Sequence, residues 1–239
     1  MDIQAVMEYN ADGYLIYAEN YTGAFVRGRT RQEAVAKFDL EIRQYLHWVT
    51  GRLDTDLAPC KVEIVQEKES PLQIRDADSD VLFDSERLPL TRNEYDHLKL
   101  LAMKSASDFQ CLYDSIPDKF GTILLPRKTF YGDVPRTAND MYEHTKNVNS
   151  YYFGEIDVKV SDEPDIVSCR RTGFDKVEAS AGFLDNGVFS GSYGEDWSLR
   201  KVCRRFIWHD RIHAKAMYRM AVRLCGERNI LNPFHLQDG

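Results

Sequence analysis

Trp208-His209-Asp210-Arg211-Ile212-His213 lies inside residues 197–225, a stretch whose apolar residues recur with the period of one long α-helix. At about 100° per residue, both histidines fall on the arc that also carries the apolar residues Val202, Phe206, Met220 and Leu224. The opposite side carries Arg200, Arg204, Arg211, Lys215 and Arg219. We therefore expect the imidazoles to point into the protein and the basic side to face water. The alternative is that this basic side docks an anionic partner or the chain's own acidic segment.

Two core-facing histidines one helical turn apart indicate a shared metal ion. A buried imidazole without a partner lowers stability, so packing alone gives little reason to place His209 and His213 on one arc. One turn of helix is the spacing at which two imidazoles bind one ion, as in His-x-x-x-His zinc sites. The pair therefore predicts a metal site whose third ligand comes from another part of the chain.

The composition excludes several classes of protein. The chain has 239 residues, of which 43% are hydrophobic, enough to build a core in one large domain or two small ones. Its net charge of −7 argues against a dedicated nucleic-acid or membrane-surface protein. No apolar run approaches the ~20 residues of a membrane span, and no signal-peptide pattern opens the sequence. We expect a cytoplasmic protein with neither nucleic acid nor membrane as a partner.

The cysteines fit the same compartment. The chain has five, an odd number, widely spaced and without a Cys-x-x-Cys pair. This pattern favours free thiols, buried or half-buried, over a disulfide framework or a thiolate zinc site.

The first part of the chain predicts an α+β module. Alternating apolar residues indicate strands at residues 3–8, 14–18, 23–26 and 61–65. Between the third and fourth strands, Thr30 and Glu33 form a capping box for one helix with an apolar stripe of Ala34, Phe38, Ile42, Tyr45 and Leu46. The order β-β-β-α-β implies a small sheet with one helix packed on it.

Three motifs of this part resemble the HicB-like antitoxin fold. They are Gly13-Tyr14, Gly23-Ala24 and Gly28-Arg29-Thr30-Arg31-Gln32-Glu33-Ala34, and the resemblance covers residues 1–67. It implies an antitoxin-type interaction domain. HicB antitoxins usually carry a further DNA-binding segment, and here no helix-turn-helix or basic ribbon is recognised.

Residues 68–90 are rich in Glu, Asp, Ser and Pro. They predict a linker or a strap on the surface, held in place by Leu72, Ile74, Val81, Leu82 and Phe83.

From residue 91 onward, the apolar residues recur with the period of an α-helix. Capping signals at Thr91 and Thr137 start two helices, separated by a long connection with extended segments at residues 122–125 and 128–131. A third helix is expected over residues 164–181 and the fourth over residues 197–225, ended by Gly226. These four helices predict an all-α four-helix bundle over residues 91–239.

The third ligand is predicted on the second of these helices. On its wheel His144 lies among Met141, Val148, Tyr151 and Tyr152, while Glu143, Lys146 and Ser150 point away. A lone histidine on one helix followed by His-x-x-x-His on the last resembles the DinB-like (DinB/YfiT) family of metal-binding four-helix bundles. The resemblance implies that His144, His209 and His213 are the metal ligands. Residues 126–132 and the long third loop depart from the family and leave the substrate side undefined.

Three neutral imidazoles leave a fourth coordination position open, where a divalent metal lowers the pKa of a water or thiol to about 7. Zinc is the expected cofactor, and nickel, iron or manganese also fit. The resemblance implies a thiol-dependent transferase or a hydrolase acting on a small molecule, with low-molecular-weight thiols as in bacterial bacillithiol- and mycothiol-dependent members. The alternative is a non-catalytic metal-binding interaction or regulatory protein that uses its HicB-like domain. A homodimer stays open as an oligomeric state.

Supporting roles are less sharply indicated. Tyr151 is the candidate catalytic residue, the alternative being core packing with its hydroxyl at a rim. Asp210 and Glu143 point about 100° away from the neighbouring ligands, so we expect surface carboxylates. For the remaining candidates we predict no site. We expect His97 to face solvent or to contact a metal ligand rather than the metal, and Cys203 to lie near the edge of the core. No candidate partner residues are recognised for His47 and His235.

Overall fold

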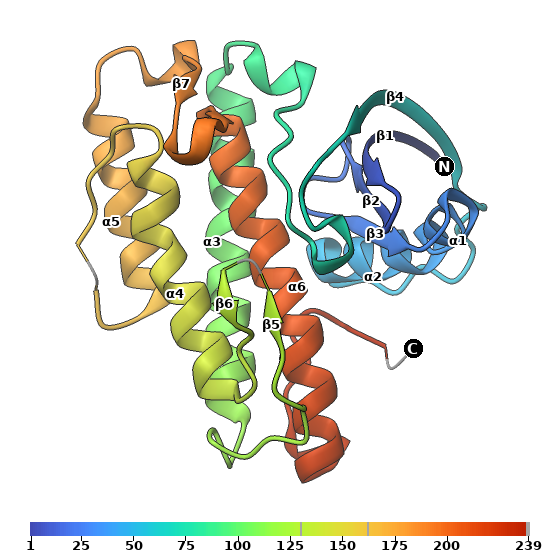
Figure 1. Ribbon diagram of the computed structural model, residues 1–239. Coiled ribbons are helices and arrows are strands. Elements are labelled where there is room, and N and C mark those ends of the chain that lie inside the picture. Colours follow the sequence, from blue (N-terminus) through green and yellow to red (C-terminus); the bar gives the residue numbers. More distant parts are fainter. Residues whose placement is uncertain (130, 162, 238–239) are drawn as a thin grey trace.

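The first four strands of the computed structural model form one sheet near the N-terminus (Figure 1). The structure describes residues 1–129, 131–161 and 163–237. The sheet has the order β3-β2-β1-β4, in which β1 pairs antiparallel with β2 and parallel with β4. These strands are β1 (Asp2–Asn10), β2 (Gly13–Ala18), β3 (Phe25–Gly28) and β4 (Lys61–Glu69).

The expected single helix between β3 and β4 is two helices. They are α1 (Arg31–Val35) and α2 (Phe38–Thr50), interrupted at Ala36 and Lys37. The Thr30 side chain caps α1 as predicted, accepting a hydrogen bond from the Glu33 amide at 3.2 Å. The carboxylate of Glu33 accepts from the Arg29 amide at 2.9 Å, one residue before the position a capping box requires.

Four longer helices follow the sheet and lie side by side (Figure 1). They are α3 (Arg92–Ser115), α4 (Ala138–Gly154), α5 (Ile166–Ala179) and α6 (Leu199–Cys225). Both predicted starts are confirmed, with Thr91 and Glu94 capping α3 and Thr137 and Asp140 capping α4. α3 and α4 each contact both α5 and α6. Mixed α+β structure, with strands before helices, is therefore confirmed.

The connections carry short elements. A hairpin of β5 (Lys128–Thr129) and β6 (Gly132–Asp133) lies between α3 and α4, where Phe130 is outside the described residues. Between α5 and α6 lie η3 (Phe183–Asp185), β7 (Phe189–Ser190), η4 (Ser192–Gly194) and β8 (Asp196–Trp197). The chain closes with η5 (Glu227–Asn229). No helix in the described ranges is long and apolar enough to cross a membrane.

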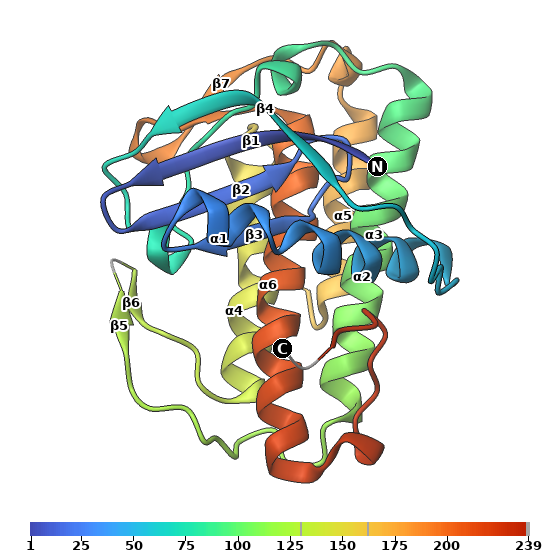
Figure 2. The ribbon, with the colours of Figure 1, turned by 90° about the vertical axis from the view of Figure 1, so that its right-hand side faces the viewer.

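Residues 68–90, the strap, cover the face of the sheet that α2 leaves open. The strap contains η1 (Ile74–Asp76) and η2 (Asp84–Arg87), and Ile74, Val81 and Phe83 are buried as predicted. They form an apolar cluster with Leu15, Tyr17 and Phe25 of the sheet and with Trp208 of α6. Figure 2 shows the strands lying across α6, so this helix lies against the covered face.

The basic side of α6 is buried, contrary to the expectation that it faces water. Arg204 pairs with Glu86 of the strap, its Nε 2.5 Å from Oε1. Arg211 and Lys215 both pair with Glu41 of α2, at 2.8 and 2.5 Å. Docking of the acidic strap, the alternative drawn from the sequence, is what the structure shows for Arg204.

The remaining two positions of that basic side differ. Arg200 donates to the backbone oxygens of Leu88 and Pro89 at the end of the strap, at 3.1 and 2.8 Å. Arg219 is exposed, as predicted. The helical wheel of α6 correctly put these basic residues on one side of the helix. That side meets the strap and α2 where solvent was expected.

Candidate metal centre

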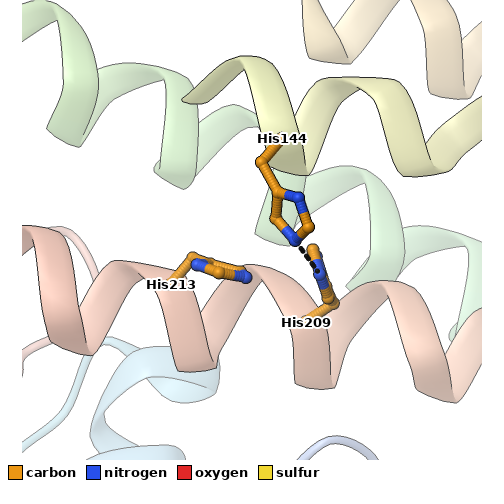
Figure 3. Close-up of side chains that lie close together, drawn as sticks. All are labelled: His144, His209 and His213. Atoms are coloured by element: carbon orange, nitrogen blue, oxygen red, sulfur yellow. Dashed lines mark hydrogen bonds between the residues drawn. The ribbon is translucent and has the colours of Figure 1, made fainter. Parts of the chain in front are cut away.

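Three histidines meet between α4 and α6 (Figure 3). The Nε2 atoms of His144 and His209 are 3.2 Å apart. The His213 ring centroid lies 4.8 Å from that of His144 and 4.5 Å from that of His209. One nitrogen from each ring lies within 4.8 Å of the others, close enough to bind a metal ion.

The nitrogen spacing fits one small divalent cation. Two imidazole nitrogens that bind one tetrahedral zinc ion at about 2.0–2.1 Å are about 3.3 Å apart. The 3.2 Å between His144 and His209 matches this value. The limit of 4.8 Å for the widest pair is longer by about 1.5 Å, so the three rings would have to draw together by up to that amount to bind one ion.

Burial keeps all three imidazoles neutral at neutral pH. Desolvation is the main cause at each residue and lowers the pKa of His144. It lowers the pKa of His213 to about 3, with His144 adding to the effect. The pKa of His209 lies well below its usual value, because His213 and His144 act on it in addition to burial. A neutral imidazole has the lone pair that a metal ion needs.

One buried atom of this cluster is unsatisfied. Among the described residues, Nδ1 of His209 has no hydrogen-bond partner, although His209 is only 7% exposed. Leaving such an atom unpaired costs about 1–3 kcal/mol. A metal ion bound to Nε2 of the same ring would leave the hydrogen on Nδ1, so this atom does not distinguish metal binding from a hydrogen bond to His144.

The β5–β6 hairpin forms the outer wall of the site. Figure 1 shows β6 beside α4 and β5 beside α6. The Tyr131 ring stacks on the His144 ring with centroids 5.8 Å apart and planes 25° apart. An ion pair between Arg127 and Asp76 ties the hairpin to the strap. The hairpin, part of the connection whose role the sequence left undefined, therefore covers one side of the histidine cluster.

Asp210 is not the surface carboxylate expected from its place beside His209. Its side chain is fully buried and forms two bonds with Arg170 of α5, at 2.5 and 3.1 Å. Arg170 also donates to Asn149 and to the Ala102 carbonyl oxygen, both at 3.0 Å. The prediction was wrong because α6 has neighbours on several sides. The side of the helix about 100° away from the two histidines faces Arg170 of α5 and not solvent. Glu143 is half-exposed and pairs with Lys146 at 2.8 Å, close to the prediction.

Tyr151 lies away from the three histidines. It is 37% exposed, its ring contacts Tyr152 and Trp197, and it lines a cleft of about 510 Å³ at the end of α4. The neighbouring Tyr152 is the tyrosine that meets His209, edge to face at 6.0 Å. The sequence placed both tyrosines on the arc of His144, and only packing separates them.

Other candidates fall as follows. His97 is exposed and Cys203 is buried, where burial raises the pKa of its thiol to about 12. His47 and His235, for which no partners were expected, stack on each other with ring centroids 3.6 Å apart. All five cysteines are free as predicted, but Cys111 is exposed rather than buried or half-buried.

Comparison of the chain with family models, with curated proteins and with solved structures gave no match. The site is therefore interpreted from its own geometry.

Proposed function

We propose that the chain is a DinB-like, metal-dependent enzyme in which His144, His209 and His213 bind one divalent metal ion. On this proposal α3 to α6 are the four-helix bundle of that family, and the N-terminal part is a HicB-like module. The observation that carries the proposal is the convergence of three imidazoles from two helices, with nitrogens no more than 4.8 Å apart.

Hydrogen bonding alone is a poorer account of this cluster. The contact between His144 and His209 joins two Nε2 atoms, so one hydrogen has to serve both rings. Three imidazole nitrogens favour zinc, with nickel, iron and manganese as further candidates. Three protein ligands are typical of catalytic rather than structural zinc sites, because a coordination position stays open.

A divalent metal in such a site lowers the pKa of a water or thiol to about 7 and supplies a nucleophile at neutral pH. The protein contributes the environment. Burial keeps the three imidazoles unprotonated, and Tyr131 covers His144 from the hairpin side. The reaction we propose is transfer or hydrolysis on a small molecule, with a low-molecular-weight thiol as the first candidate co-substrate.

The competing hypothesis is a non-catalytic protein whose HicB-like module binds a partner. Leu15, Tyr17 and Phe25 on one face of that sheet are already packed against the strap and Trp208. A partner would have to use another surface of the module or displace the strap. For this reason we prefer the enzyme.

Metal analysis tests the proposal. We expect about one metal ion per chain in the wild type and in His97→Ala, a matched control at an exposed histidine, and none in His209→Ala. A metal-free wild type, together with unaltered stability of His209→Ala, would refute it. Activity is then sought with bacillithiol, mycothiol, cysteine and ester substrates, and should be lost in His209→Ala but kept in His97→Ala.

A further inference from the structure

A second cleft, of about 310 Å³, lies where the N-terminal sheet, the strap and the β5–β6 hairpin meet. Four arginines line it: Arg27 of β3, Arg29 just after β3, Arg75 of η1, and Arg127 just before β5. The fold therefore brings guanidinium groups together from segments up to 100 positions apart in the sequence.

Three carboxylates line the cleft with the four arginines, but only one of these arginines, Arg127, forms an ion pair among the described residues. Asp76 pairs with Arg127, and Glu33 accepts from Lys37 at 2.8 Å. Asp12 also lines the cleft, at the β1–β2 turn. Among the described residues, no ion pair within 4.0 Å includes the guanidinium of Arg27, Arg29 or Arg75.

The cations of the cleft disfavour one another. Arg27 is exposed, but partial desolvation in the cleft lowers its pKa; Asp76 opposes this shift, and Arg127 and Arg219 lower the pKa further. The Arg27 side chain has one weak bond, from Nη1 to the Arg75 carbonyl oxygen at 3.3 Å. Arg219 comes from the exposed end of the basic side of α6, so a fifth arginine adds to the positive potential. An anion between these groups would relieve the repulsion.

We propose that this cleft binds the phosphomonoester group of a small molecule. A guanidinium fork matches phosphate oxygens bidentately, and charge-assisted bonds of this kind are among the strongest in proteins. Several arginines lining one cleft suit a dianion better than the single charge of a carboxylate. The volume is at the lower end of the range for small-molecule sites. The net charge of −7 disfavours a nucleic-acid polymer as the source of the phosphate.

The cleft and the three histidines share the β5–β6 hairpin. Arg127 lines the cleft, and Tyr131, four residues later, stacks on His144. A phosphate bound at Arg127 therefore lies beside the segment that forms the outer wall of the histidine cluster. Phosphate binding itself needs no metal, so this proposal does not rest on the proposed function.

Calorimetric titration with glycerol 3-phosphate at constant ionic strength tests the proposal. We expect saturable binding that Arg75→Gln and Arg27→Gln each weaken by about tenfold or more, the value of a lost charge-assisted bond. Arg52→Gln, at an exposed arginine beyond the far end of α2, is the matched control and should bind as the wild type does. Circular dichroism confirms that each variant is folded.

Three results would overturn the proposal. They are equal affinity in the wild type and Arg75→Gln, heat that sodium chloride reproduces at the same ionic strength, and tighter binding of a short RNA that has only phosphodiesters. His209→Ala should keep glycerol 3-phosphate binding. A protein that binds phosphate but no metal would refute the proposed function alone.

Discussion

Removal of the Glu41 carboxylate tests the most consequential contact between the N-terminal part and α6. Glu41 lies on α2 and is 5% exposed, and its oxygens meet Arg211 at 2.8 Å and Lys215 at 2.5 Å. Burial alone would raise the pKa of Glu41, but Lys215 and Arg211 hold it below its usual value. The carboxylate is therefore ionised and compensates two buried or half-buried cations.

Glu41→Gln keeps the shape of the side chain and removes its charge. The Arg211 guanidinium is fully buried and cannot lose its proton, so it becomes an uncompensated charge. Lys215 can respond, because burial already lowers its pKa to about 8. Breaking one partner of such a pair costs about 3–5 kcal/mol, a large share of the roughly 5–15 kcal/mol that stabilises a domain.

Urea unfolding followed by far-ultraviolet circular dichroism measures the loss. Asp96→Asn is the matched control, since Arg92 and Asp96 form an exposed pair at 2.9 Å on α3, where solvent screens the interaction. A double-mutant cycle of Glu41→Gln with Lys215→Met separates the contribution of the lysine. If Glu41→Gln costs no more than the control, the basic side of α6 is solvated and the docking described above is wrong.

Three further outcomes are expected. Because the pKa of His213 falls from 6.5 to about 3 on folding, this residue alone should cost metal-free protein about 1.4 kcal/mol of stability per pH unit between pH 6.5 and 3, in addition to the losses from His144 and His209. His213→Gln should flatten this slope in urea titrations at pH 5, 6 and 7, and an unchanged slope would contradict the shift. Asp210→Asn should destabilise by about 3–5 kcal/mol, since Arg170 stays buried and charged, and a loss under 1 kcal/mol in the same assay would refute this. With native protein and a disulfide reagent, Cys111 should react at once and Cys203 only on unfolding, and rapid modification of Cys203, identified by mass spectrometry, would show that α6 opens.

Two positions show how packing can give a residue a role that the sequence only hints at. Gly23 belongs to a Gly-Ala turn motif, but a Cβ atom there would lie 2.3 Å from Cγ2 of Ile207 on α6. The glycine is thus required for close approach of the sheet to α6, as well as for its positive φ of 90°. For Asp210, a helical wheel gives the direction of the side chain but not its partner. That partner is Arg170, 40 positions away in the sequence.

The amino-acid sequence alone determined the features that depend on neighbours three or four residues apart. These include the caps at Thr91 and Thr137, the end of α6 at Gly226, and the shared arc of His209 and His213. Such features are local because backbone hydrogen bonds and side-chain caps span one turn of helix.

Only the tertiary structure decided what each side of α6 meets. A helical wheel gives angles between residues, but it does not say which direction is solvent. Arg211 finds Glu41 across 170 positions and Arg204 finds Glu86 across 118, and neither pairing has a periodic signal. The close approach of His144 to His209, 3.2 Å between atoms 65 positions apart in the sequence, likewise depends on how α4 and α6 pack together.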